Sequence, residues 1–284
     1  MNALSLVWFR VYLFKFFASL TLIALISACG GSTGFPPVVT GVKVQSLQYG
    51  RTATIFIGGK DLRTSVTVDT SGACTDSSFA TNSSTDTLVL NCKVAQVGDW
   101  PLVLKSAEGK VIHSSTLNVP QPEVTFFTSA GNITMELNPA VAPITVINFL
   151  SYVNTGYYRS TLFHRVIPGF MIQGGGYTTG LVKRAGLAPI VLESNKGLSN
   201  LRGTVAMART NVADSATTEF FINLVDNTFL DYRNAASPGY AVFGKVTQGQ
   251  DVVDAIGVKQ TGVLNGFIDV PLEEITITLA LQVK

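Results

Sequence analysis

Histidine is scarce in this chain, which has two among 284 residues, His113 and His164. Serine and cysteine hydrolases need a histidine as general base beside the nucleophile. Zinc sites need several histidines or cysteines at close spacing, and the three cysteines are as isolated as the histidines. No group of carboxylates has metal-ligand spacing either. The sequence therefore argues against a hydrolase triad and a metal site, and we interpret His113 as an ordinary strand-edge residue.

The chain also lacks a charged run of either sign. Lysine and arginine number 20, aspartate and glutamate 18, and charged residues make up 13% of the chain. Without a basic patch there is no sign of nucleic-acid binding, and without an acidic tail there is none of disorder. The triple glycine 174–176 does not start a dinucleotide-binding loop, because G-x-G-x-x-G needs a glycine where Thr179 stands.

The first 28 residues have the composition of an export signal. Arg10 and Lys15 precede an uncharged apolar run over residues 16–28. That run fits the h-region of a signal peptide and is shorter than the ~20 residues that a membrane-spanning helix needs. It leads into the sequence LISAC, which resembles the bacterial lipobox, whose cysteine (here Cys29) is lipidated and becomes the mature N-terminus. The alternative is an ordinary signal peptide followed by an incidental thiol.

The lipobox implies a location in the bacterial cell envelope. Gly30 follows the cysteine where an aspartate would favour the inner membrane, so we expect a lipid-anchored protein of the outer membrane that faces the periplasm. Residues 29–37 are rich in glycine and predict a flexible tether, since a coil of eight such residues spans roughly 16 Å. We expect membrane association through this lipid anchor, and a monomer.

Residues 38–120 predict a domain of β-strands. Short runs rich in β-branched and apolar residues, such as Thr52 to Ile57, alternate with turns that contain glycine. Regular short strands with turns between them are typical of a β-sandwich. Export would place Cys74 and Cys92 in an oxidising compartment, where we expect them to pair; the alternative is two buried free thiols. Part of the segment loosely resembles the immunoglobulin-like (Ig-like) IPT/TIG modules.

The most distinctive stretch is FHRVIPGFMIQGG, residues 163–175. The Pro-Gly pair in its middle predicts a tight turn between two apolar strands. Because successive strand residues face opposite sides, Met171 and Gln173 should share one side of the second strand and Phe170 the other. Arg165 lies near the same end of the sheet, although arginine is seldom buried without a partner. Spacing alone is equally consistent with an edge hairpin that carries a solvated arginine.

This stretch resembles the signature of the cyclophilin family of peptidyl-prolyl cis-trans isomerases. The resemblance continues through TSAGNITMEL, APITVINFLSYVNTGYY, GTVAMARTNVADSATTEFFINLVDNTFLD and GYAVFGKV, and it covers residues 124–284. It implies an eight-stranded antiparallel β-barrel capped by two helices. Together with the Ig-like sandwich expected before it, the barrel makes a mainly β chain. The residue pattern agrees, because it predicts one helix from Pro143, with apolar residues at i, i+3, i+4 and i+7, and a second over Asp251 to Ile256.

The resemblance also implies the functional residues. Arg165 corresponds to the catalytic arginine of the family. His164 we interpret as structural, because neighbours on a strand face opposite ways. A groove for the proline and the residue before it would be lined by Phe170, Met171, Gln173, Ala208, Arg209, Glu219, Phe221, Phe229, Leu230 and Tyr240.

Glu219 departs from the family pattern, which has glutamine before the two phenylalanines. A carboxylate here could pair with Arg165 and hold it away from substrate, since opposite charges within ~4–6 Å favour each other's ionised form. Alternatively, Glu219 points to solvent and changes little. The first alternative favours a second hypothesis for the barrel, a module that binds proline-containing segments or envelope partners with little or no turnover.

The function that the resemblance implies is isomerisation of X–Pro bonds in exported polypeptides as they fold. The barrier to rotation is about 18–20 kcal/mol because amide resonance is broken. The reaction needs no nucleophile, proton transfer, metal or other cofactor. In the twisted state the amide dipole is smaller and the nitrogen lone pair can accept a hydrogen bond, so an apolar socket with one arginine favours that state. The sequence thus predicts an enzyme without a cofactor whose partners are proline-containing chains.

Overall fold

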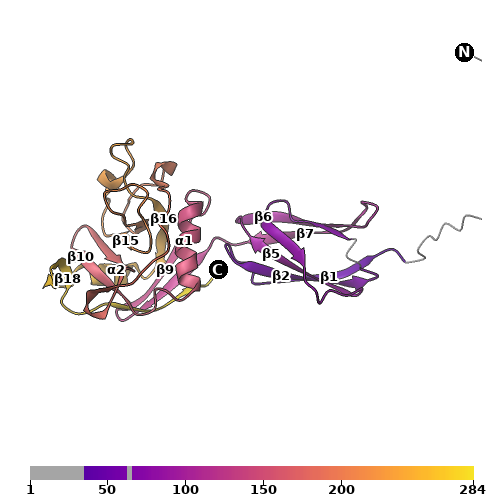
Figure 1. Ribbon diagram of the computed structural model, residues 1–284, viewed down its shortest axis with the longest axis horizontal. Coiled ribbons are helices and arrows are strands. Elements are labelled where there is room, and N and C mark those ends of the chain that lie inside the picture. The colour runs from indigo at the N-terminus through magenta and orange to yellow at the C-terminus, as the bar shows by residue number, and fades with distance from the viewer. Residues whose placement is uncertain (1–34, 63–65) are drawn as a thin grey trace, which may run out of the picture. The chain divides into compact units, whose positions relative to one another are not determined.

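The structure is a computed structural model that describes residues 35–62 and 66–284 (Figure 1). The predicted export signal, residues 1–28, and the predicted lipidation site Cys29 lie outside the described residues, as does most of the predicted tether. Within the described ranges, no helix is both long and apolar enough to cross a membrane.

The N-terminal part contains two antiparallel sheets, with strand orders β1-β2-β5-β4 and β3-β6-β7. Ala53, Ile55 and Ile57 of β2 are fully buried, whereas the residues between them are partly exposed, as expected of a strand with one face on a core. The strands are β1 (Val38–Gln45), β2 (Thr52–Lys60), β3 (Thr67–Asp69), β4 (Cys74–Phe79), β5 (Thr87–Val94), β6 (Gly98–Lys105) and β7 (Val111–Val119).

Cys74 and Cys92 form a disulfide bond between the adjacent strands β4 and β5, as the sequence predicted. Cys92 is fully buried, in a core that also contains Leu102 and Leu117 of the other sheet. Both sheets thus contribute to one apolar core. The assignment of this part to an Ig-like sandwich stays a prediction.

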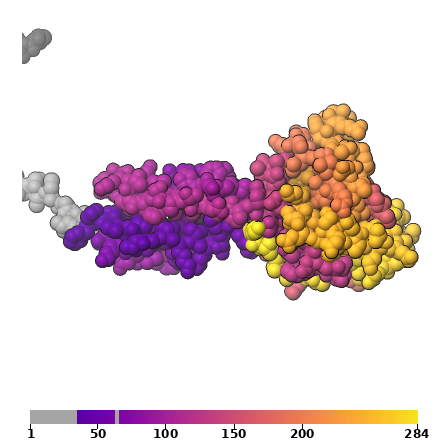
Figure 2. Space-filling model, turned by 180° about the vertical axis from the view of Figure 1, so that it is seen from behind, coloured from indigo at the N-terminus to yellow at the C-terminus, as the bar shows by residue number. Residues whose placement is uncertain are grey.

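Eight antiparallel strands close into a barrel in the order β10-β11-β15-β14-β16-β9-β8-β19, which confirms the barrel predicted from the sequence. The chain's last strand pairs with the barrel's first, and the yellow C-terminal residues accordingly lie beside the magenta residues of β8 and β9 in Figure 2. The strands are β8 (Glu123–Thr128), β9 (Gly131–Leu137), β10 (Thr161–Ile167), β11 (Met171–Gly174), β14 (Thr204–Met207), β15 (Phe220–Asn223), β16 (Val242–Gln248) and β19 (Thr276–Gln282).

In the described ranges, two α-helices accompany the barrel, α1 (Pro143–Asn154) and α2 (Gln250–Gly257), close to the predicted positions. Helix α1 has proline at its start and buries the predicted i, i+3, i+4, i+7 set from Val146 to Val153. The smaller elements are β12 (Tyr177–Thr178), η1 (Thr179–Leu181), β13 (Val182–Lys183), η2 (Ser194–Lys196), η3 (Thr228–Leu230), β17 (Thr261–Leu264) and β18 (Phe267–Pro271).

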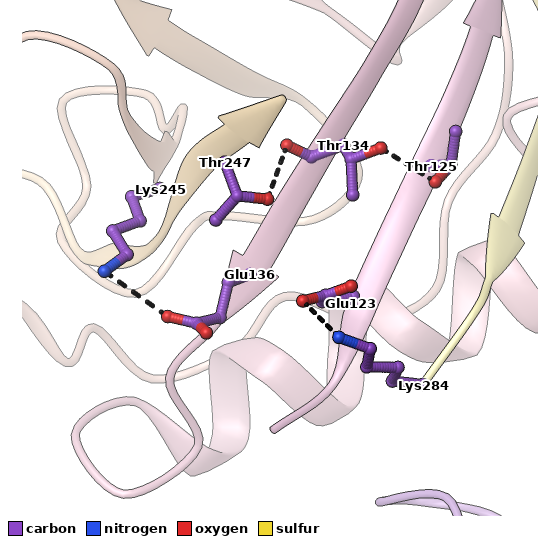
Figure 3. A network of polar contacts seen from close by, with 7 residues as sticks. All are labelled: Glu123, Thr125, Thr134, Glu136, Lys245, Thr247 and Lys284. Carbon is purple, nitrogen blue, oxygen red and sulfur yellow. Dashed lines mark hydrogen bonds and ion pairs between the residues drawn. The ribbon is translucent and has the colours of Figure 1, made fainter. Parts of the chain in front are cut away.

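Aromatic side chains fill the interior of the barrel. Phe126 and Phe220 have ring centroids 5.2 Å apart, and Phe149 packs on Phe243 at 4.9 Å. Polar side chains that alternate with the buried ones link neighbouring strands instead (Figure 3). Lys245 of β16 lies 3.4 Å from Glu136 of β9, Thr247 donates to the Thr134 backbone oxygen, and Thr125 of β8 contacts the Thr134 hydroxyl at 3.0 Å. The two faces of the sheet are therefore distinct, and this fixes the strand register.

Candidate functional site

Part of the barrel wall is apolar on both faces. Ile172 of β11 and Phe220 of β15 belong to the barrel core, whereas their neighbours Met171 and Phe221 belong to a second buried cluster, together with residues of β14 and β16. Since successive strand residues face opposite sides, this second cluster lies on the outer face of the same four strands. An apolar outer face that is sheltered from solvent makes a floor for a ligand.

A pocket of about 230 Å³ lies over this floor. Arg165 of β10 pairs with Gln173 of β11, which in turn pairs with Phe221 of β15. Residues opposite one another on adjacent strands share a face, so the pairing brings these three side chains together. All the residues that line the pocket were predicted from the sequence: Arg165, Phe170, Met171, Gln173, Ala208, Arg209, Phe221, Leu230 and Tyr240.

Phe170 lines the pocket beside Met171, although strand alternation predicted that the two face opposite sides. The prediction was wrong because β11 begins at Met171 and Phe170 belongs to the preceding turn, where a two-residue period does not apply. Asn227 donates from Nδ2 to the Phe170 backbone oxygen at 2.9 Å and holds this turn. Phe229 stacks on Phe170 with ring centroids 5.8 Å apart, but it is 59% exposed and does not itself line the pocket.

Arg165 is the cation at one side of the pocket. Its Nε donates to Oδ2 of Asp269 in β18, over 3.4 Å, and the two side chains are 39% and 33% exposed. In the described part of the chain, the two terminal nitrogens of the guanidinium make no hydrogen bond. Of the two alternatives that the sequence left open for Glu219, the pair with Arg165 is not found, because Arg165 contacts Asp269 instead.

Arg209 is held by its own surroundings. Its Nε donates to the Gly239 backbone oxygen at 2.9 Å and its Nη1 to that of Thr210 at 2.8 Å. The guanidinium carbon lies 4.6 Å from the centroid of the Tyr240 ring, which packs edge-on against Phe221. Stacking and hydrogen bonding leave Arg209 little freedom, so it forms a rigid wall of the pocket.

Glu219 lies just before β15 and adjoins the pocket without lining it. Its Oε2 accepts a hydrogen bond from Nε2 of Gln173 at 2.8 Å, and Nε2 of His164 lies 3.2 Å from the same oxygen. Burial would raise the pKa of the Glu219 carboxyl, but hydrogen bonds from His164 and Gln173 outweigh burial and hold the pKa below its usual range. Neither of the two alternatives drawn from the sequence, a pair with Arg165 or a solvated side chain, describes Glu219.

His164 lies at a β-bulge, because the register between β10 and β11 shifts between Phe163 and Arg165. A bulge redirects a side chain, so the alternation that separates His164 from Arg165 in an ideal strand does not hold here. The imidazole is 5% exposed, packs on the Tyr177 ring at 4.6 Å between centroids, and reaches Glu219. His164 is thus structural, as predicted, but it also contacts the site.

Two further residues that support the site were not predicted. Asp269 reaches Arg165 from a distant hairpin, and no local pattern marks it. Asn227 does leave a signal, since it follows Asn223 in an apolar stretch, and buried asparagines need hydrogen-bond partners. Asn227 indeed donates to Oδ1 of Asn223 at 2.8 Å, and both are almost fully buried.

Comparison with known proteins accounts for this arrangement. Residues 123–280 match the family model described as cyclophilin type peptidyl-prolyl cis-trans isomerase/CLD. Peptidyl-prolyl cis-trans isomerase cyp18 of Streptomyces antibioticus is 55% identical over 155 residues, which are 54% of this chain and 93% of that protein. Peptidyl-prolyl cis-trans isomerase B of Escherichia coli is 49% identical over 156 residues, 54% of this chain and 95% of that protein. A crystal structure of a cyclophilin type isomerase from Cryptosporidium parvum, in the presence of the dipeptide Ala-Pro, is 26% identical with a TM-score of 0.49, and covers 57% of this chain and 99% of that chain.

The match extends over more than half of the chain and nearly the whole length of these bacterial relatives. Barrel, pocket and relatives define a class of enzyme that acts on the bond before proline. The chain belongs to the family of cyclophilin-type peptidyl-prolyl cis-trans isomerases.

Proposed function

We propose that Arg165 is the catalytic group of this isomerase and that the proline ring of the substrate occupies the apolar socket over Met171 and Phe221. One observation carries the proposal. A guanidinium whose terminal nitrogens make no hydrogen bond within the described residues lies on the same face as a buried apolar floor. A cationic donor beside an apolar surface is the combination that a twisted prolyl amide requires.

The physical basis is differential binding of the twisted amide. The planar amide has a large dipole, which an apolar socket solvates poorly, whereas the twisted amide has a smaller dipole and a nitrogen with a free lone pair. An arginine that donates to this nitrogen binds the transition state more strongly than the ground state. A hydrogen bond to a charged group contributes about 1.5–3 kcal/mol, which corresponds to roughly one to two powers of ten in rate.

The second hypothesis, a module that grips proline-containing segments without turnover, depended on Arg165 being held by Glu219. In the structure Glu219 contacts His164 and Gln173 instead, and among residues 35–62 and 66–284 the polar contact of the Arg165 side chain is that of Nε with Asp269. A partly exposed pair at 3.4 Å contributes only about 0–1 kcal/mol, so it does not withdraw the arginine from a substrate. The geometry therefore favours the enzyme.

The test is the rate of isomerisation of a proline-containing peptide in a protease-coupled assay. Replacement Arg165→Ala should lower kcat/KM by about tenfold or more. Arg165→Lys keeps the charge but loses the planar array of donors, so its rate should lie between the two. Thermal unfolding of each variant controls for folding. Turnover of Arg165→Ala equal to that of the unchanged protein would refute the role of the arginine.

For the cellular setting, we infer a lipid-anchored protein of the bacterial outer membrane that faces the periplasm, acts as a monomer and assists the folding of exported proteins. Residues 1–28 would be its signal, Cys29 the lipidated residue, residues 29–37 the tether, residues 38–120 an Ig-like spacer and residues 124–284 the isomerase. The disulfide between Cys74 and Cys92 supports this setting, because such bonds persist in oxidising compartments. Replacement Cys29→Ala should move the protein from the membrane to the soluble fraction, and an unchanged distribution would contradict the anchor.

A further inference from the structure

Glu219 determines which atom of Gln173 faces the groove. An ionised carboxylate only accepts hydrogen bonds, so the Gln173 side chain must turn its NH₂ group toward it. The Nε2–Oε2 distance of 2.8 Å is that of a well-formed bond. The carbonyl oxygen of the same amide, Oε1, is then the polar atom that Gln173 offers to the pocket, which its side chain lines.

The position of Glu219 is itself tightly determined. Its backbone oxygen accepts from the Ala208 N–H at 2.9 Å, next to β14. A β-carbon on Gly176 would lie 2.5 Å from Cγ of Glu219, so only glycine leaves room for this side chain. Nε2 of His164 lies 3.2 Å from the same carboxylate oxygen that accepts from Gln173.

His164 reinforces the orientation. Its Nδ1 is buried and makes no hydrogen bond within the described residues, whereas its Nε2 lies beside Oε2 of Glu219. A carboxylate oxygen only accepts hydrogen bonds, so the ring carries a proton on Nε2 and presents an N–H donor to Glu219. Glu219 thus receives two donors from two adjacent strands, and reversal of the Gln173 amide would set two oxygen acceptors against each other.

We propose that Glu219 is a positioning residue that holds the Gln173 side-chain amide with its carbonyl oxygen toward the groove, so that this isomerase selects peptides with a backbone N–H at that point. The inference rests on the proposed function of the groove. A glutamine at position 219 would donate as readily as it accepts, and Gln173 could then adopt either orientation. The carboxylate removes that freedom, and with it the ability to bind an acceptor in the same place.

Two effects follow for Glu219→Gln. If the amide of Gln173 is free to reverse, about half of the molecules present the correct atom, so KM for an ordinary peptide rises about twofold while kcat stays the same. More informative is a series of peptides in which each N–H in turn is replaced by an ester oxygen. The unchanged protein should reject one member of the series by roughly tenfold or more, because that ester oxygen faces the Gln173 oxygen. In Glu219→Gln this rejection should shrink to about twofold to threefold, since the amide can reverse and donate.

The test also asks whether Glu219 acts through Gln173. In a Gln173→Ala background, Glu219→Gln should change neither KM nor the pattern over the ester series, because the group that it orients is missing. The matched control is Glu136→Gln, the same chemical change at a glutamate that pairs with Lys245 on another part of the barrel (Figure 3). Its ester pattern should equal that of the unchanged protein.

The outcomes separate this inference from the proposed function. If the unchanged protein does not turn over any proline peptide, the proposed function fails. If it does, but Glu219→Gln shows the same ester pattern as the unchanged protein, or still alters it in the Gln173→Ala background, the positioning role is refuted while the isomerase stands. The positioning role is established if Glu219→Gln loses the rejection of the one ester peptide and if the same replacement has no effect in the Gln173→Ala background.

Discussion

The contact between Asp269 and Arg165 lends itself to a quantitative prediction. Asp269 has a backbone φ of 61°, in the left-handed region where asparagine and aspartate are the best tolerated residues other than glycine. Asp269→Asn therefore keeps the backbone and the shape of the side chain, and removes only the charge. An alanine at this position would add backbone strain, so asparagine is the sharper replacement.

The structure sets the size of the effect. The Nε–Oδ2 distance is 3.4 Å and both side chains are about one-third exposed, so the pair contributes about 0–1 kcal/mol after screening by solvent. If Asp269 steadies Arg165 for the twisted amide, Asp269→Asn lowers kcat by at most about fivefold and leaves KM nearly unchanged. Stability should change by less than about 1 kcal/mol.

The assay is isomerisation of a proline peptide over a range of salt concentrations. Salt screens a partly exposed pair, with a Debye length of about 10 Å at 0.1 M. The activity of the unchanged protein should therefore fall toward that of Asp269→Asn as salt rises, while the variant stays flat. A rate increase in the variant would show that Asp269 competes with substrate for Arg165, and a loss far above tenfold would show that it does more than position the arginine; either result refutes the reasoning.

Two other predictions concern stability. Reduction of the Cys74–Cys92 bond, which closes a loop with a sequence separation of 18, should destabilise the N-terminal sheets by about 3 kcal/mol in urea unfolding and leave peptide turnover unchanged, since neither cysteine lines the pocket. The second concerns Glu219. Burial would raise the pKa of its carboxyl, but hydrogen bonds from His164 and Gln173 and the charge of Lys183 hold that pKa below the usual range, with Tyr157 and Tyr177 as further titratable neighbours. A depressed folded-state pKa stabilises the folded protein above the unfolded-state pKa, and this contribution is lost as pH falls through the folded-state pKa. The stability difference between the unchanged protein and Glu219→Gln should therefore shrink as pH falls below about 4.3, the unfolded-state pKa of glutamate, and a constant difference would contradict the assignment.

The lining of the pocket could be predicted from the sequence because it resides in contiguous motifs. Arg165, Met171 and Gln173 come from one hairpin, and Phe221 comes from the strand that pairs with it. When local order determines which residues share a face, a recognisable motif carries the geometry with it. The same reasoning predicted the buried face of α1, where spacing alone fixes which residues point inward.

Ideal periodicity failed where the backbone departs from it. Phe170 lies in a turn and His164 in a bulge, and in both places an argument from alternation assigns the wrong side. The partner of Arg165 could not be predicted for another reason, since Asp269 approaches from a hairpin about a hundred residues further along the chain. The case of Glu219 lies between the two. Its departure from the family pattern is visible in the sequence, but its contact with His164 depends on a bulge that the sequence does not predict.

Arg165, Arg209 and Glu219, three charged side chains around the pocket, are each held by partners within the protein, and this affects how the pocket can bind a peptide. Arg165 is tethered through Nε by Asp269, Arg209 is occupied by two backbone oxygens and the Tyr240 ring, and Glu219 accepts from His164 and Gln173. Each charge thus has a fixed partner, and the polar atoms that remain for a peptide include the terminal nitrogens of Arg165 and, in our proposal, the carbonyl oxygen of Gln173. These two residues are register partners on β10 and β11. One donor and one acceptor thus lie side by side over an apolar floor. The acceptor can hold a peptide by an N–H while the neighbouring prolyl nitrogen turns toward the arginine, and no step of this reaction requires a proton transfer.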